Sequence, residues 1–203
     1  MLFLLRSHEM KDFHRQDPLL SLCGLACCLC PMELGGYCPG CGGGRGNQPC
    51  AIARCSLAHG RVAYCCACEA YPCPISGTAE AYDSFITHRN RLENLERARR
   101  DLQGLQKELE EKRDILLELL TNHNDGRCKT LYCLGVNLLP LEDLRGIRTQ
   151  CRGVPEKGVA ARLIREAAAN SPLKTVYLET FYTGYNQQKS SNVPLACYLI
   201  TDY

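Results

Sequence analysis

The stretch Cys23-Gly-Leu-Ala-Cys27-Cys28-Leu-Cys30 opens a segment, residues 23–73, that holds 12 of the chain's 16 cysteines. The segment continues with Cys38-Pro39-Gly40-Cys41, Cys50-x4-Cys55, Cys65-Cys66-Ala67-Cys68 and Pro72-Cys73. Two residues between cysteines let the chain turn once and bring two sulfurs about 3.8 Å apart, the separation that tetrahedral zinc requires. Three such pairs in one short segment indicate a metal site.

Ten cysteines fit such a site, and they are Cys23, Cys27, Cys30, Cys38, Cys41, Cys50, Cys55, Cys65, Cys68 and Cys73. Two zinc ions with four thiolates each need eight of them, so two would be spare or bridge a third metal. Pairing in chain order would join Cys27 and Cys30 to Cys38 and Cys41, and Cys50 and Cys55 to Cys65 and Cys68. An interleaved pairing would join Cys27 and Cys30 to Cys50 and Cys55, and Cys38 and Cys41 to Cys65 and Cys68. We favour interleaving, because it closes longer loops and restricts the unfolded chain more.

Two other uses of the cysteines are open. A disulfide framework needs an oxidising compartment, but the apolar run at residues 1–5 is shorter than the roughly 7–15 apolar residues of a secretory signal. No stretch is long and apolar enough to predict a membrane span, so we expect a cytoplasmic protein with reduced thiols. Thiolates also bind iron–sulfur clusters, which makes a redox or metal-dependent enzyme the alternative function. Because no catalytic constellation of carboxylates, phosphate loop or Ser/His/Asp residues stands out, we expect no enzyme.

Charge argues against a nucleic-acid partner. The net charge is +2, and residues 16–77 hold three arginines against three acidic residues. Each zinc with four thiolates adds a charge of −2, whereas nucleic-acid binders are basic on the binding face. The segment also has few large aliphatic residues, so we expect it to fold only with metal and to act through a protein partner.

The cysteine block resembles a bacterial and archaeal family, domain-of-unknown-function family 3795. Its pattern of Cys-Gly-Leu-x-Cys-x2-Cys, Cys-x-Gly-Cys, Cys-x4-Cys and Cys-x2-Cys before Pro-Cys matches residues 22–76 in order and spacing. The resemblance implies a zinc-binding role without an established activity. Cys28 and Cys66 are additional to the pattern, so we expect them to be non-ligands.

Residues 78–121 predict one long amphipathic helix, because Leu95, Leu102, Leu109 and Leu116 recur every seven residues. Gly104 lies inside the stripe, but the leucine phase is unchanged across it, so we expect a continuous helix. The complementary heptad positions are polar at Arg99, Gln106 and Arg113, which favours packing within the chain. A homodimer through this helix is the alternative.

Three shorter helices are predicted at 127–139, 141–151 and 156–170, and their Cys128, Cys133 and Cys151 read as small buried hydrophobes. Strand-like residues 175–182 and 193–201 predict either a C-terminal hairpin or a loosely held tail. The sequence therefore predicts a mainly α protein with an irregular, metal-stabilised Cys-rich module. Its parts are a lead-in (1–22), the module (23–77), a helical domain (78–170) and a tail (171–203).

Overall fold

The computed structural model describes residues 12–44, 50–77, 85–154 and 156–171. Regular structure in this part of the chain is entirely helical, which confirms the predicted class. The elements are the 3-10 turns η1 (Cys27–Leu29) and η2 (Cys65–Ala67) and the helices α1 (Pro31–Leu34), α2 (Ala51–Ala58), α3 (Pro74–Gly77), α4 (Arg91–Asn122), α5 (Lys129–Leu138), α6 (Leu141–Cys151) and α7 (Val159–Asn170). The predicted C-terminal strands lie outside the described residues.

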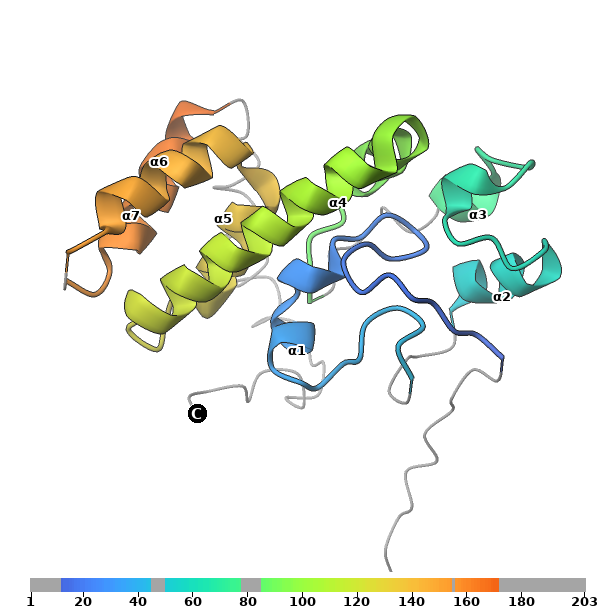
Figure 1. The fold of residues 1–203 in the computed structure, drawn as a ribbon, viewed down its shortest axis with the longest axis horizontal. Helices are drawn as coiled ribbons and strands as arrows, with labels where there is room; N and C mark the ends of the chain where they lie inside the picture. The colour runs from blue at the N-terminus through green and yellow to red at the C-terminus, as the bar shows by residue number, and fades with distance from the viewer. Residues whose placement is uncertain (1–11, 45–49, 78–84, 155, 172–203) are drawn as a thin grey trace, which may run out of the picture.

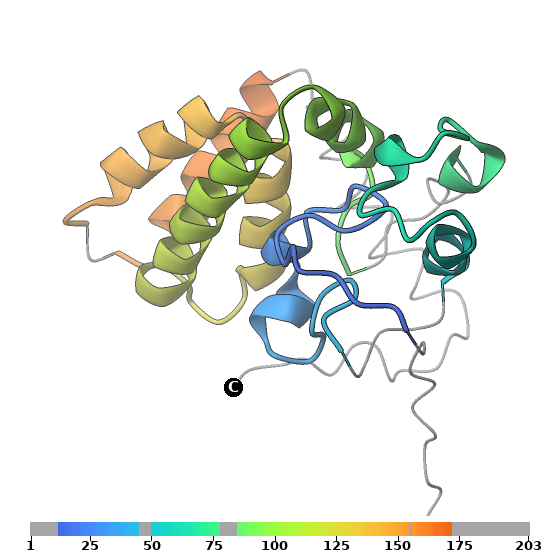
Figure 2. The same ribbon diagram turned by 45° about the vertical axis from the view of Figure 1, so that its right-hand side comes forward.

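Helix α4 lies between two unequal parts of the molecule (Figures 1 and 2). Helices α5 and α6 pack on one side of it and carry α7, and the Cys-rich segment with η1 and η2 packs on the other side. Its leucine stripe is buried at Leu95, Leu109 and Leu116 in a core shared with α5–α7. Packing of the stripe within the chain is thus confirmed, whereas a homodimer stays an untested prediction. None of the described helices is long and apolar enough to cross a membrane.

The prediction of one continuous helix over 78–121 was wrong in two respects. The helix begins at Arg91, since residues 85–90 are not helical, and Asp101 interrupts it with φ −153° and ψ 84°. The Asp101 carboxylate accepts a hydrogen bond of 2.9 Å from the backbone N–H of Gly104, as the N-cap of a new helix does. A Cβ on Gly104 would lie 2.1 Å from this carboxylate, so glycine leaves room for the cap. Heptad spacing could not reveal this, because the leucine phase survives the kink.

The other helices agree with the predicted ones to within three residues at each end. Helix α4 ends at Asn122, where Asn124 accepts from the N–H groups of Gly126 and Cys128, as the Asn-Asp-Gly sequence predicts. Helix α7 begins at Val159 rather than at residue 156, after Gly158 with φ +94°. Cys128, Cys133 and Cys151 are buried in the main core, as expected.

The loop at Cys23 lies directly on the first turn of α4. Gly24 has φ +93°, and a Cβ built there would lie only 2.2 Å from the carbonyl oxygen of Arg91. The Asn94 side chain donates a hydrogen bond of 2.9 Å to the Gly24 carbonyl. The Cys-Gly sequence at the start of the motif is therefore required both by the backbone conformation and by the close approach to α4.

A Gly24→Ala substitution should destabilise the protein more than a Gly60→Ala control. Both glycines have positive φ, which costs an L-residue about 1–2 kcal/mol, but nothing lies within 4 Å of a Cβ at Gly60. Urea unfolding of the two variants measures the difference. Equal losses of stability would show that the loop does not press on α4 as described.

Candidate metal centre

Two Cys-Cys-x-Cys sequences fold into the same local structure. In each, a 3-10 turn carries the first three residues, η1 at Cys27 and η2 at Cys65. The N–H of the last cysteine donates to the carbonyl of the first at 3.0 Å in both turns. The two turns are therefore closed by the same backbone hydrogen bond.

The middle cysteines, Cys28 and Cys66, belong to the interface with α4. Cys28 is 1 % exposed, its burial raises the pKa of the thiol to about 12, and its main charged neighbour is Arg113 in the second half of α4. Burial also raises the pKa of Cys66, whose charged neighbours Glu96 and Arg99 lie in the first half. The 3-10 turn η1 thus packs near the second half of the kinked helix, and η2 packs near the first half. Their packing on α4 accounts for two cysteines that the metal pattern leaves over.

A first group of cysteines gathers around Cys27. Burial raises the pKa of its thiol above the ordinary range, and the nearby Cys41, Cys23 and Cys30 thiols raise it further. Cys41 in turn lies near Cys23 and Cys50. Backbone N–H groups point at these sulfurs, from Cys41 to Cys27, from Leu22 to Cys41 and from Ala53 to Cys50, the last at 3.2 Å. Such donors stabilise a thiolate, the form that binds metal.

A second group surrounds a small cavity of about 20 Å³, room for a single water molecule or ion. Four cysteines line it, Cys55 from α2, Cys65 and Cys68 from η2 and Cys73 just before α3. Burial raises the pKa of Cys65 to about 12, and Cys23, Cys73 and Cys55 contribute through their charge. His59 also lines this cavity, with Nδ1 3.5 Å from the Cys55 sulfur.

The structure therefore divides the ten predicted ligands unevenly. Cys30 links the first group to Cys38, because it lies near both Cys27 and Cys38. Cys23 lies within electrostatic range of both groups, near Cys27 and near Cys65. The neighbours of Cys27 and Cys65 match neither the sequential nor the interleaved pairing in full, and the ligand set itself stays a prediction.

Among the described residues, no three Cys, His, Asp or Glu side chains form a group that could hold a metal ion as they stand. All fifteen described cysteines are free thiols, so no disulfide frame is present in that part of the chain. The soft sulfur donors, their N–H partners and the ion-sized cavity nevertheless fit zinc or iron better than hard cations.

Arg91, the first residue of α4, ties the two groups together. Its side chain is 1 % exposed and donates to the carbonyl of Cys23 at 3.5 Å and to the carbonyl of Ser76. Its positive charge also acts on the Cys65 thiol, favouring the thiolate. The buried Arg91 guanidinium lies between the two groups of cysteines. Its positive charge would offset the negative charge that this region would carry once metal is bound.

A second polar contact joins the lead-in, the segment before η2 and α4. The Asp17 carboxylate accepts hydrogen bonds from the Tyr64 hydroxyl and, at 3.1 Å, from the Gln106 amide of α4. The Arg15 guanidinium lies 5.1 Å from the centre of the Tyr64 ring and donates to the carbonyls of Leu20 and Ala63. Residues of the segment 12–22 thus contact both the module and α4.

Sequence reasoning missed Arg91 and Asp17, because one charged residue outside a motif gives no signal. It could have found the repeated Cys-Cys-x-Cys turn, which stands in the sequence at 27–30 and again at 65–68. Comparison of the chain with protein-family models, curated proteins and solved structures finds no match. The resemblance to domain-of-unknown-function family 3795 stays untested, so the functional proposal depends on the cysteine geometry.

An Asp17→Asn substitution should lower the free energy of unfolding by about 1–3 kcal/mol, because it disrupts a partly buried charged hydrogen-bond acceptor. Burial raises the pKa of Asp17, but hydrogen bonds from Tyr64, Gln106 and two backbone N–H groups outweigh it, and the net pKa lies below its ordinary value of 3.8.

The stabilisation by Asp17 should therefore be constant above pH 3.8 and be lost only as the pH falls through the lower folded-state value. Urea unfolding between about pH 8 and about pH 5 should give one constant difference from wild type, since Asp17 is ionised there in both states. Asp114→Asn, on the exposed face of α4, is the control. If it costs as much, the Asp17 contacts contribute nothing specific.

Proposed function

We propose that this chain is a cytoplasmic zinc-binding protein that acts through protein interaction rather than catalysis. The observation that carries the proposal is the ion-sized cavity lined by Cys55, Cys65, Cys68 and Cys73. Four thiolates in a tetrahedron are the usual ligands of structural zinc. Reduced thiols at so many positions favour a reducing compartment such as the cytoplasm.

The two zinc ions would use the two groups of cysteines. Cys55, Cys65, Cys68 and Cys73 would hold one ion, and Cys23, Cys27, Cys41 and Cys50 the other. Cys30 and Cys38 would be the spare pair among the ten candidates. Zinc would supply folding free energy, on the order of 10 kcal/mol or more per site, to a segment with little apolar core.

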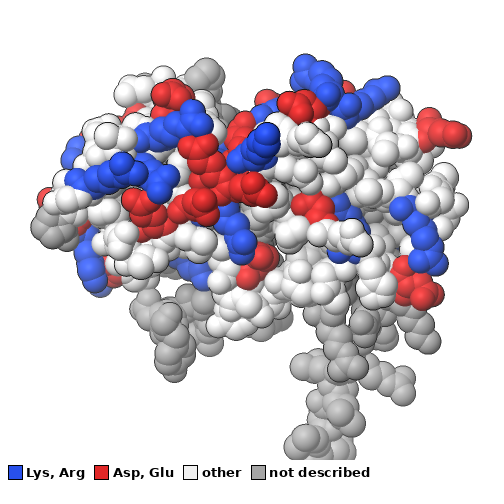
Figure 3. Space-filling model, in the orientation of Figure 1, with Lys and Arg blue, Asp and Glu red and all other residues white. Residues whose placement is uncertain are grey.

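The surface of the module supports a protein partner. Figure 3 shows that charged residues gather over the helical half, whereas the Cys-rich side is mostly uncharged in this view. Tyr37 is 62 % exposed in the module, and Ile75 is 38 % exposed beside the second cysteine group. Exposed tyrosine and apolar residues are typical of protein interfaces, and phosphate backbones require basic surfaces instead.

Metal analysis of the protein purified without oxygen tests the proposal. We expect about two zinc ions per chain and no visible absorption, because zinc has a filled d shell. A brown protein with iron and sulfide would instead support the iron–sulfur alternative and overturn the zinc assignment.

Serine substitutions test the division of the ligands. Cys68→Ser should reduce the zinc content from two ions to one and expose the second group to thiol labelling, while the first group stays protected. Cys41→Ser should do the reverse. Cys66→Ser is the matched control, because Cys66 packs toward α4 and should leave both ions in place.

Three outcomes contradict the division of the ligands. One is unchanged zinc content in both ligand variants, which would remove Cys41 and Cys68 from the ligand set. Another is exposure of Cys50 together with Cys55 in Cys68→Ser, since these two cysteines belong to different groups here. A loss of zinc in Cys66→Ser would make the middle cysteine a ligand.

A further inference from the structure

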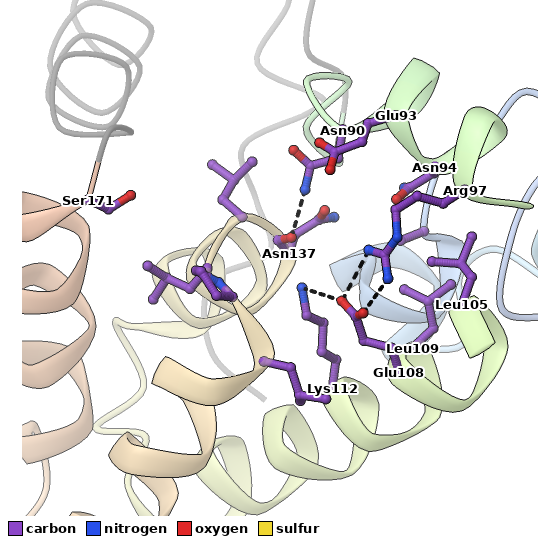
Figure 4. Close-up of a pocket in the computed structure, with 15 residues that line it drawn as sticks. Asn90, Glu93, Asn94, Arg97, Leu105, Glu108, Leu109, Lys112, Asn137 and Ser171 are labelled. Atoms are coloured by element: carbon purple, nitrogen blue, oxygen red, sulfur yellow. Dashed lines mark hydrogen bonds and ion pairs between the residues drawn. The ribbon is translucent and has the colours of Figure 1, made fainter. Parts of the chain in front are cut away.

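A separate cavity of about 470 Å³ lies on the other side of α4 from the second cysteine group, and no cysteine is among its described lining residues (Figure 4). It is bounded by both halves of the kinked helix and by the junction between α5 and α6. Its volume falls within the range of small-molecule sites, roughly 300–1,000 Å³. Because α4 is kinked at Asp101, the helical turn around Arg97 and the helical turn around Lys112 line the same cavity.

Lys112 is a buried cation in this cavity. It is 6 % exposed, and its ammonium group has one ion-pair partner among the described residues, Glu108 at 3.4 Å. Glu108 is engaged more closely by Arg97, which binds both of its oxygens. A buried ammonium with three donors and one distant partner retains hydrogen-bonding capacity toward the cavity.

Asn137 is a second polar residue of the cavity. It is 4 % exposed. Its backbone carbonyl is already occupied by the Asn90 amide at 2.9 Å. Asn137 and Lys112 both line the cavity (Figure 4). A carboxylate placed between them would accept from both.

Glu93 is the second carboxylate among the described lining residues. Its side chain is exposed in the first turn of α4, it takes part in no ion pair with a described residue, and its charge acts on both Arg97 and Lys112. Arg97 and Lys112 balance Glu93 and Glu108, so the lining has no net charge. A plain anion would add an uncompensated negative charge beside two carboxylates, whereas a zwitterion would add none.

The remaining wall is apolar. Leu138, Leu139, Pro140 and Leu141 form it at the α5–α6 junction, with Leu105 and Leu109 of α4 across from them. This combination of apolar wall and a few convergent polar groups is typical of ligand sites.

We propose that this cavity binds a free amino acid with an apolar side chain. The carboxylate of the ligand accepts hydrogen bonds from Lys112 and Asn137, and its ammonium group pairs with Glu93. Its side chain packs against the wall formed by residues 138–141. This site is independent of the zinc proposal, since it uses no thiol.

Isothermal titration calorimetry of the full, zinc-loaded chain tests the proposal with three matched probes. L-leucine carries both charged groups, 4-methylpentanoate lacks the ammonium group, and 3-methylbutan-1-amine lacks the carboxylate. We expect L-leucine to bind at least about tenfold more tightly than either analogue, since each lost charged contact is worth about 1.5–3 kcal/mol. L-methionine and L-phenylalanine extend the test to other apolar side chains.

Two variants with controls on the same helix locate the site. Lys112→Met should abolish L-leucine binding, whereas Lys107→Met, on the exposed face of α4, should leave it unchanged. Glu93→Gln should weaken the binding of L-leucine but not of 4-methylpentanoate, with Glu110→Gln as its control. Glu93 is exposed, so this variant tests the site even if Lys112→Met fails to fold.

The proposal is overturned if none of the three amino acids binds. It is also overturned if 4-methylpentanoate binds as tightly as L-leucine, because the ammonium contact would then be absent. Binding that survives both Lys112→Met and Glu93→Gln would place the ligand elsewhere.

Discussion

The structure depends on the packing of two equivalent Cys-Cys-x-Cys turns against the two halves of one kinked helix. Asp101 caps the second half of α4 and so turns the first half away. Cys28 then packs near Arg113, and Cys66 packs near Glu96 and Arg99. The middle cysteine of each turn packs toward the helix, and Cys28 is fully buried there, whereas Cys66 is partly exposed.

Polar contacts hold the loops of the module that its small apolar core does not reach. The buried cluster of the module proper is small, with Phe13, Leu22 and Ala53 at its centre. Arg91 and Asn94 of α4 instead hold the carbonyls of Cys23 and Gly24, and Asp17 joins Tyr64 to Gln106. These contacts orient the loops but add only modest net stability, about 0.5–1.5 kcal/mol for each neutral hydrogen bond. The proposed metal ligation would be a far larger contribution, on the order of 10 kcal/mol or more per site.

The sequence predicted those features that a repeating pattern encodes. The leucine stripe, the short helices and the burial of Cys128, Cys133 and Cys151 follow from periodicity and residue type. The kink did not, because one aspartate within a helix reads as a surface residue unless its carboxylate is seen capping Gly104. The grouping of the cysteines also depends on contacts between loops that are distant in the sequence. The spacing of the cysteines does not determine these contacts. The burial of Lys112 also depends on the packing around the kink, and residue type alone does not predict it.

X-ray absorption spectroscopy at the zinc edge of the intact, anaerobically purified protein tests the central claim most directly. The account predicts four sulfur neighbours per zinc at about 2.3 Å, with no nitrogen or oxygen in the first shell. Because the two groups use different cysteines, it also predicts no short metal–metal distance. A shell with nitrogen or oxygen ligands, a bridged metal pair or iron in place of zinc would contradict it.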